Sequence, residues 1–315
     1  MVGKVTDDKQ MSVSRLPALL GHSPYSSRNE ELQYSRDAIA GTLEPWAGNE
    51  ATGWGNTLEP VCIKIAGERL GVDRLVTEIT EPYIHPELPL QASLDAVGEF
   101  EKPVTFVTDP DAGIYVVGAD IITLDGCGCI ENKVTSVRPE DVPALHRGPI
   151  QAQGQMMCSG FKWAAVCVLY QGIEMRIFLF APHPGTVAAI SEAVLDFDQR
   201  LTTGEWYDLE RAHPGDALLL YPEADEEVPI ILEAECATFA KAIVTSKEAI
   251  KTCEQVIGDA NLAIQSYMGN HGLAKCGAYE IKWGMRNMKA QPEKTTPAKA
   301  AKTVRSKTVT VKEVA

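Results

Sequence analysis

The tripeptide Glu131-Asn132-Lys133 places a carboxylate and an ammonium group two residues apart in a predicted strand, residues 129–134. Side chains at positions i and i+2 of a strand point to the same side of the sheet, so the two groups are expected to lie together. Burying these two charged groups costs desolvation free energy, and such a cost is expected where the groups have a chemical function. Phosphodiester hydrolysis uses such a pair, because the carboxylate holds a divalent ion against the phosphate while the lysine orients or deprotonates the attacking water. An exposed ion pair on an edge strand is the alternative interpretation of the tripeptide alone.

Polar residues elsewhere in the chain supply the other groups that this chemistry needs. Asp95 interrupts an otherwise apolar segment, residues 92–96, where an unpaired carboxylate would be costly. Glu59 lies on a predicted helix whose face is mainly apolar. Gln151 and Gln155 share one face of another predicted helix, at spacing i, i+4. Three acids, a lysine and a glutamine in this order form a much more specific pattern than the tripeptide does.

This ordered set resembles the YqaJ-like viral recombinase family, the lambda-exonuclease-type nucleases of the PD-(D/E)xK superfamily. The resemblance covers residues 12–180. The family pattern is a short N-terminal helix with a serine, a helical G-x-x-x-E, an aspartate in a hairpin strand, E-x-K, and Q-x-Q ahead of a methionine. In this sequence the pattern falls on Ser14, Gly55, Glu59, Asp95, Glu131, Lys133, Gln151, Gln153 and Met156. Residues 15–25 also look like the opening segment of the family.

The resemblance implies a role for each of these residues. Asp95 and Glu131 would bind the metal, helped by the backbone carbonyl of Asn132. Glu59 would complete the acidic cluster, directly or through water. Two Mg²⁺ ions about 4 Å apart, with Mn²⁺ as a substitute, would stabilise the attacking and the leaving oxygen. Lys133 and Gln151 would position the nucleophilic water. Ser14 would either contact a terminal 5′ phosphate or serve only as a helix cap.

Two departures from the family pattern affect the site. An apparent extra hairpin, residues 104–123, lengthens the interval from Asp95 to Glu131, and within it Asp120 is a rival metal ligand nearer to the glutamate. Asp95 is preferred because its neighbours match the family pattern better. The family often carries Trp-x-x-x-Arg before the first helix, where the arginine holds the 5′ phosphate. Residues 1–13 contain neither Arg nor Trp, which leaves open how this chain recognises a DNA end.

The elements that must position these residues follow from hydrophobic periodicity and turn signals. Helices are expected over residues 14–20, 29–39, 50–70, 150–161 and 186–201. Strands are expected over residues 75–81, 90–99, 104–108, 114–124, 129–134, 164–170 and 174–180. This order predicts one α/β core, residues 1–221, and the resemblance implies a restriction-endonuclease-like fold with a mixed central sheet flanked by helices.

A different region is expected to follow this core. Residues 222–288 are predicted to form a helical C-terminal extension, with one or two long helices over 226–268 and a short strand at 278–283. Residues 289–315 form a basic tail that is predicted to be disordered. This tail is a solvated linker, a DNA tether or a segment that docks a partner.

The composition limits the partners of the chain. A net charge of −14 over 315 residues is not that of a protein that coats nucleic acid, so any contact with DNA must be local. No run of about 18 apolar residues indicates a membrane span, and residues 1–10 lack the apolar core of a signal peptide. Eight cysteines spread through the predicted elements fit reduced thiols in the cytoplasm, and their spacing does not fit an iron–sulfur cluster.

The pattern and the resemblance together lead to one functional expectation. The chain is expected to be a Mg²⁺-dependent exonuclease that degrades linear double-stranded DNA, 5′→3′, and leaves 3′ single strands for phage-type homologous recombination. Expected partners are double-stranded DNA ends, a single-strand annealing protein and further copies of the chain in a ring, often a trimer. A phage or prophage origin in a bacterial cytoplasm would follow. The alternatives are an endonuclease or single-strand nuclease of the same fold, and a non-catalytic recombination scaffold.

Overall fold

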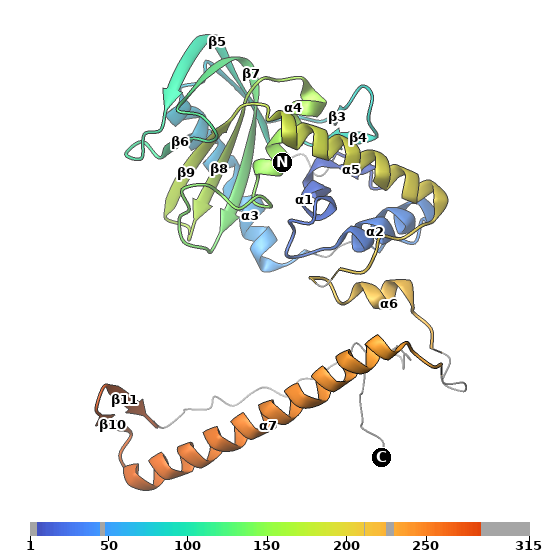
Figure 1. Ribbon diagram of the computed structural model, residues 1–315. Coiled ribbons are helices and arrows are strands. Elements are labelled where there is room, and N and C mark those ends of the chain that lie inside the picture. The colour runs from blue at the N-terminus through green and yellow to red at the C-terminus, as the bar shows by residue number, and fades with distance from the viewer. Residues whose placement is uncertain (1–4, 45–47, 211, 225–229, 285–315) are drawn as a thin grey trace. The chain divides into compact units, whose positions relative to one another are not determined.

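The structure is a computed structural model that describes residues 5–44, 48–210, 212–224 and 230–284. The chain divides into two compact units, Met1–Leu220 and Tyr221–Ala315, and each is described by itself. Figure 1 shows the elements of both units. Within the described residues, no helix combines the length and the apolar character that crossing a membrane requires.

A six-stranded sheet forms the centre of the first unit (Figure 1). Its order is β2 (Arg74–Val76), β5 (Ala96–Val107), β7 (Ile121–Thr135), β8 (Ala164–Tyr170), β9 (Glu174–Phe180) and β6 (Ile114–Val116). Strand β7 pairs antiparallel with β5 and parallel with β8. The sheet is therefore mixed, as predicted from the sequence.

Helices cover both faces of this sheet. On one face, Ile63 and Ala66 of α3 (Glu50–Leu70) belong to the same core cluster as Ile130 of β7. On the other face, Ala152 of α4 (Pro149–Ser159) belongs to a second cluster with Cys129 and with residues of α5 (Pro184–Thr203). Neighbouring residues of a strand point to opposite faces, which is why consecutive positions of β7 enter different clusters. The prediction of a sheet flanked by helices is confirmed.

The predicted strand at residues 90–99 is wrong in one respect that matters for the site. Its first part is β4 (Leu90–Ala92), which belongs to a separate three-stranded sheet with β1 (Met11–Ser12) and β3 (Tyr83–Ile84). Residues 93–95 then carry the chain across to β5 in the central sheet. Hydrophobic alternation continues through this crossing, so the sequence alone gives no sign of the change of sheet.

The β5–β7 hairpin is longer than predicted. The predicted strand at 104–108 is the continuation of β5, and the predicted strand at 114–124 divides between β6 and the start of β7. Asp125-Gly126, predicted to be a turn, lies inside β7. A register shift between Phe100 and Val104 accommodates the irregular pairing opposite this dipeptide. A β-bulge of this kind lets a strand continue through residues that resemble a turn.

The N-terminal helices of the first unit are tied to its C-terminal end. The helix predicted at 14–20 is a 3₁₀ turn, η1 (Val13–Arg15), followed by α1 (Leu16–Leu19). The next helix, α2 (Arg28–Ala40), begins after Ser27, which forms a capping box with Glu30, and the neighbouring Asn29 does not cap it although asparagine is a common cap residue. Asn29 is buried and instead donates to Asp216 in α6 (Asp216–Leu220), at 3.0 Å.

The second unit contains one long helix and a hairpin. Helix α7 (Ala234–Met268) is continuous, and the antiparallel strands β10 (Leu273–Cys276) and β11 (Tyr279–Lys282) follow it. The strand predicted at 278–283 corresponds to β11, whereas β10 was not predicted. Residues 226–229 of the predicted helical segment and the tail at 289–315 lie outside the described residues.

Candidate active site

Glu131 is the centre of a polar cluster between β7 and α4. Its side chain is 2% exposed, and both of its carboxylate oxygens have partners. Lys133 Nζ donates to Oε1 at 2.6 Å, and Gln155 Nε2 donates to Oε2. The two charged residues of the tripeptide thus lie side by side, as the strand period predicts. They form an ion pair in which the lysine side chain keeps 29% of its surface exposed.

Asp95 lies across the hairpin from Glu131. It is the last residue before β5, whose first residue, Ala96, pairs with Ile130 of β7. The Asp95 side chain is half-buried, and its Oδ2 accepts a hydrogen bond from the backbone N–H of Asn132 at 2.8 Å. The crossing from one sheet to the other therefore brings this carboxylate to the middle of the tripeptide.

Glu59 on α3 is half-buried, and it is the third carboxylate of a cluster that contains one ammonium group, that of Lys133. Burial, together with the negative charge of Glu131, raises the pKa of the Glu59 carboxyl above its usual value. The same two causes raise the pKa of Asp95 well above its usual value, against the opposing effect of Lys133. Burial by itself lowers the pKa of Lys133, but the surrounding carboxylates outweigh burial and raise it. Three interacting carboxylates therefore share one ammonium group.

The donor set suits a divalent cation in chemical kind and in charge. Carboxylate and carbonyl oxygens are the ligands that Mg²⁺ prefers, and Asp95, Glu131, Glu59 and the Asn132 carbonyl are of this kind. Burial is the largest cause of the raised carboxyl pKa values of Glu59 and Asp95, and the neighbouring carboxylate of Glu131 adds to it. Among the described residues, however, no three His, Cys, Asp or Glu side chains converge closely enough to form a metal-binding group. The residues fit the ion in the kind of their donor atoms, and in this structure the two carboxylate oxygens of Glu131 are engaged by Lys133 and Gln155.

A glycine at the start of α4 lets this helix approach the sheet. Gly148 precedes the helix with φ 114°, a conformation that favours glycine. A Cβ atom at this position would lie 2.4 Å from the side chain of Val166 on β8. Because β8 is the neighbour of β7, this close approach places the first turns of α4 over the strand that carries Glu131.

The three glutamines of α4 have different surroundings. Gln155 is fully buried and bonds to Glu131, while its Oε1 has no hydrogen-bond partner within the described residues. Gln153 binds the backbone on both sides of residue 182, donating to Ala181 O at 2.9 Å and accepting from His183 N at 2.7 Å. Gln151, the predicted catalytic glutamine, is 8% exposed in the first turn. The i, i+4 spacing of Gln151 and Gln155 indicates that both lie on one face of α4. Gln155 makes the contact with Glu131, although the sequence suggested a catalytic role for Gln151 and not for Gln155.

Asp120, the rival metal ligand, lies far from the cluster. It is exposed in the bend between β6 and β7, next to Ile121, the residue that pairs with Val107 at the distal end of the hairpin. Eleven residues of chain separate it from Glu131, which corresponds to roughly 35 Å of strand. The structure brings Asp95 to Glu131 and leaves Asp120 at the opposite end of β7.

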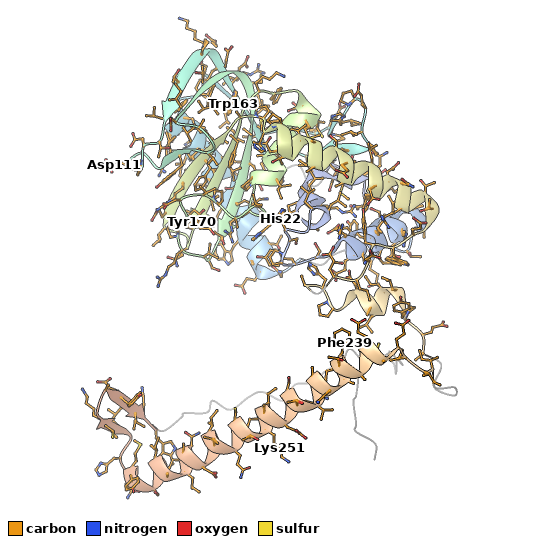
Figure 2. The ribbon with its side chains drawn as sticks, in the orientation of Figure 1. His22, Asp111, Trp163, Tyr170, Phe239 and Lys251 are labelled. Atoms are coloured by element: carbon orange, nitrogen blue, oxygen red, sulfur yellow. The ribbon has the colours of Figure 1, made fainter. Side chains whose placement is uncertain are left out.

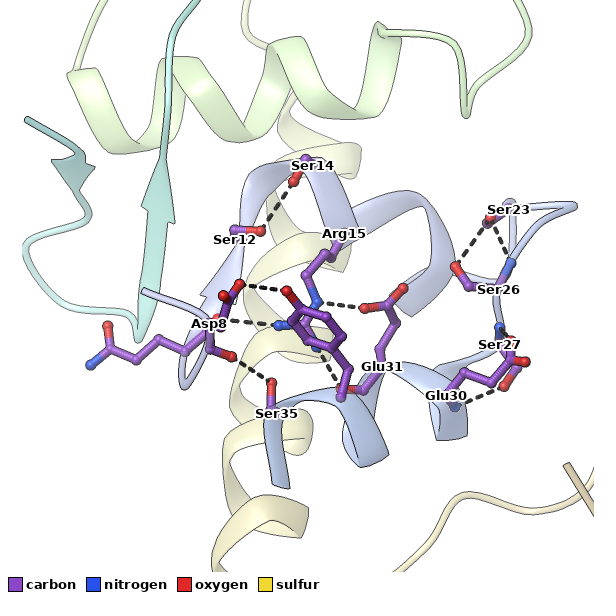
Figure 3. A network of polar contacts seen from close by, with 12 residues as sticks. Asp8, Ser12, Ser14, Arg15, Ser23, Ser26, Ser27, Glu30, Glu31 and Ser35 are labelled. Carbon is purple, nitrogen blue, oxygen red and sulfur yellow. Dashed lines mark hydrogen bonds and ion pairs between the residues drawn. The ribbon is translucent and has the colours of Figure 1, made fainter. Parts of the chain in front are cut away.

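Ser14 lies outside this cluster, in the 3₁₀ turn η1. Its side chain is exposed, and its Oγ lies 3.1 Å from that of Ser12, which occupies the N-cap position (Figure 3). Ser14 is therefore not the helix cap that the sequence suggested as one alternative. The adjacent Arg15 side chain is directed into the protein, where its guanidinium group binds Glu31.

The cysteines near Glu131-Asn132-Lys133 are packed among other side chains of the core. Gly128, between Cys127 and Cys129, faces the indole of Trp163 so closely that a Cβ atom would lie 2.0 Å from it. Burial raises the pKa of the Cys129 thiol to about 12. The buried Cys167 thiol on β8 donates to the Glu131 carbonyl at 3.2 Å, a contact that the sequence did not indicate. Burial keeps both thiols protonated, and they lie in β7 itself and in the adjacent strand β8.

Comparisons with known proteins give structural likeness only. No protein-family model and no curated protein matches the chain. The structure is similar to the alkaline exonuclease LHK-Exo from Laribacter hongkongensis, with 17% sequence identity and a TM-score of 0.45 over 63% of this chain and 90% of that chain. It is also similar to a phage-related exonuclease from Haemophilus somnus 129PT, with 15% identity and a TM-score of 0.38 over 62% of this chain and 96% of that chain. Both of those structures are of proteins described as exonucleases.

Proposed function

We propose that this chain is a Mg²⁺-dependent nuclease that hydrolyses phosphodiester bonds of linear double-stranded DNA. The observation that supports this most directly is the juxtaposition of Asp95, directly before β5, with Glu131 and Lys133 on the antiparallel strand β7, where the Asn132 N–H fixes Asp95. Clusters of titratable groups with perturbed pKa values are typical of functional sites. A purely structural ion pair would not need the further carboxylates at positions 59 and 95.

Each residue of the cluster has a proposed task. Asp95, Glu131 and the Asn132 carbonyl would hold the cation, with Glu59 acting directly or through water. When bound, divalent ions supply Lewis-acid stabilisation of the phosphate and a water of lowered pKa. Lys133, as an ammonium group, orients the attacking water or a phosphate oxygen. Two glutamines complete the set: Gln155 fixes the orientation of Glu131 through its hydrogen bond, and Gln151 is retained as a residue that positions water.

The finer proposals rest on the sequence resemblance. We propose that hydrolysis starts at a DNA end and runs 5′→3′, leaving a 3′ strand for a single-strand annealing partner. We also propose a ring of subunits, often a trimer in proteins of this kind. A ring suits the net charge of −14, because only its inner channel need be basic and a closed ring stays on DNA without a strong positive field.

The decisive experiment compares linear and circular duplex DNA with and without Mg²⁺. We expect the linear duplex to be degraded in Mg²⁺ or Mn²⁺ and not in chelator, and the closed circle to remain intact. A linear substrate with and without a 5′ phosphate tests how the end is recognised. Cleavage of the circle would establish the endonuclease alternative instead.

The matched variants are Lys133→Ala and Lys162→Ala, the second at an exposed position outside the cluster. Lys133→Ala should abolish digestion and keep the fold, as measured by circular dichroism. Lys162→Ala should digest DNA at the wild-type rate. If the folded wild-type protein degrades no DNA with either ion, the non-catalytic scaffold is the correct alternative.

A further inference from the structure

Helix α7 contains an apolar repeat with a period of seven residues. Four isoleucines recur at this interval along the helix, and a cysteine occupies the position one interval before the first. The residue three positions after each member forms a second row. In heptad notation the a positions are Cys236, Ile243, Ile250, Ile257 and Ile264, and the d positions are Phe239, Ser246, Cys253, Ala260 and Tyr267. Such a repeat, sustained over five heptads, is the pattern of a coiled-coil helix.

The repeat is exposed within its own unit. Ile250 and Ile257 are 58% and 60% exposed, and Tyr267 is 92% exposed. Among the described residues of α7, Met268 is the one that is buried. Helices in proteins owe most of their stability to packing of an apolar face, so an exposed stripe on a helix of 35 residues needs a partner. Figure 2 shows the side chains along α7 and labels Phe239, in the repeat, and Lys251, outside it.

We propose that α7 associates with the α7 helix of a second copy of this chain, in an antiparallel coiled coil. In that orientation each a residue faces a d residue of the partner helix. With Ile250 opposite Cys253, all five a positions find a d partner, and the pairing is centred close to the middle of the helix. The resulting layers are Cys236 with Tyr267, Ile243 with Ala260, Ile250 with Cys253, Ile257 with Ser246, and Ile264 with Phe239.

Side-chain volume favours this orientation over a parallel one. The three central antiparallel layers each combine an isoleucine with a small residue, so the total side-chain volume is similar in all three layers. A parallel pair in register would alternate layers of two isoleucines with layers of two serines, two cysteines or two alanines. Uneven layers of this kind leave cavities, and cavities are destabilising.

Charge favours the antiparallel orientation as well. The flanking e positions include Lys247 and Glu254, and in an antiparallel coil e positions of one helix lie beside e positions of the other. The two-fold symmetry then places each lysine beside the glutamate of the partner helix, twice per dimer. In a parallel coil the e positions would face g positions, which are uncharged: Ala242, Ala249, Val256 and Ala263. These small g residues also allow the helices to approach closely.

The length of the helix is sufficient for a stable contact. At 1.5 Å per residue, α7 is about 52 Å long. The a, d and g positions together make the wide apolar stripe of helices that pack in bundles. This contact is independent of the proposed nuclease chemistry, since it uses a unit that contains none of the site residues.

A pair of matched substitutions tests the contact in the full chain. Ile257→Asp places a carboxylate in the repeat, and Leu262→Asp makes the same kind of change at an outward f position that is 67% exposed. By sedimentation equilibrium, the mass of the Ile257→Asp variant should be half that of the wild type, while Leu262→Asp keeps the wild-type mass. A ratio of two is expected both for a dimer held by α7 alone and for two rings joined to each other through their α7 helices. Far-UV circular dichroism checks that both variants retain equal helix content.

Three outcomes would overturn the proposal. If Ile257→Asp keeps the wild-type mass, the repeat does not join copies, and α7 packs on its own chain or on another protein. If both variants halve the mass, association does not depend on the heptad face. If the wild type already has the mass of Ile257→Asp at tens of micromolar, there is no association to explain.

The orientation is tested separately by exchanging charges. Lys247→Glu alone and Glu254→Lys alone should each weaken association by roughly tenfold, because like charges then meet at the e positions. An equimolar mixture of the two variants should regain wild-type association, since every contact again joins opposite charges. If neither single variant changes association, the helices are not antiparallel in this register.

Discussion

Two buried charged clusters of the first unit differ in how well their charges are balanced. Around Arg15 (Figure 3), the guanidinium binds the Glu31 carboxylate and the backbone carbonyls of Glu31 and Gln10, and it lies 4.7 Å from the centre of the Tyr34 ring. Around Lys133, one ammonium group serves three carboxylates, and the neighbouring Gln155 has an unpartnered buried oxygen.

The difference separates a structural cluster from one that needs something further. A buried ion pair with its hydrogen bonds satisfied holds its surroundings in place, and removal of one partner is costly. A cluster with excess negative charge destabilises the folded protein until a cation compensates it. Residues that lower the stability of the folded protein are expected at functional sites.

The largest expected effect concerns the acids of the unbalanced cluster. Asp95→Asn should lower the rate of DNA hydrolysis by about 10²- to 10⁴-fold, because metal-assisted stabilisation of charge is worth several kcal/mol. Asp120→Asn, the same change at the distal end of β7, should keep the wild-type rate. Single-turnover digestion of a labelled linear duplex measures both. Equal loss in the two variants would mean that Asp120 belongs to the site.

The balanced cluster should respond in stability and not in chemistry. Arg15→Met leaves Glu31 buried without its partner, and we expect the free energy of unfolding to fall by about 3–5 kcal/mol. The control is Lys64→Met, which removes an exposed pair with Glu68 and should change stability by less than about 0.5 kcal/mol. Urea unfolding followed by circular dichroism gives both values. A loss below about 1 kcal/mol for Arg15→Met would contradict the contrast between the clusters.

Two neighbouring glutamines of α4 sharpen the comparison within one helix. Gln155→Met should slow hydrolysis by roughly tenfold through misorientation of Glu131, with little change in stability, because it also removes an unpartnered oxygen. Gln153→Met should leave the rate per folded molecule unchanged and cost about 1–3 kcal/mol, since two backbone groups lose their partner. The two variants are compared by rate and by urea midpoint. If Gln153→Met slowed hydrolysis and Gln155→Met lowered stability, the roles of the two glutamines would be the reverse of those proposed.

The smallest expected effect is in the pH dependence of thermal stability in chelator. Because the folded-state pKa of Asp95 lies above its unfolded value, this group stabilises the fold at low pH, near its usual pKa of about 4, and the contribution is lost as pH rises through the folded pKa. Asp95→Asn should therefore melt above the wild type at pH 7–8 and not at pH 4. Mg²⁺ should raise the Tm of the wild type and close the gap. A gap that is independent of pH would exclude this explanation.

The sequence predicts part of the site because some of its geometry is local. The period of a strand is enough to place Glu131 beside Lys133, and a glycine stop signal with helical periodicity is enough to bound α3 at Glu50–Leu70. These relations need no knowledge of the rest of the chain.

The parts that were not predicted depend on pairing between distant segments. The division of residues 90–99 between two sheets is set by what pairs with each half, and the bulge in β5 by the strand opposite it. The choice of Gln155 as the residue that contacts Glu131 depends on how closely Gly148 lets α4 approach β8. Spacing identifies the face of a helix, but not which of its turns lies over an acid.

The distribution of thiols gives the two units different reactivity toward electrophiles. Thiolate is the reactive form of cysteine, and burial keeps the thiols of Cys129 on β7 and Cys167 on β8 protonated. Cys253 and Cys276 are exposed in the second unit. A thiol-alkylating reagent should therefore mark the second unit first and spare the buried thiols of β7 and β8. Since Cys253 lies in the heptad repeat, its rate of alkylation would report, without any substitution, whether α7 is covered by another helix.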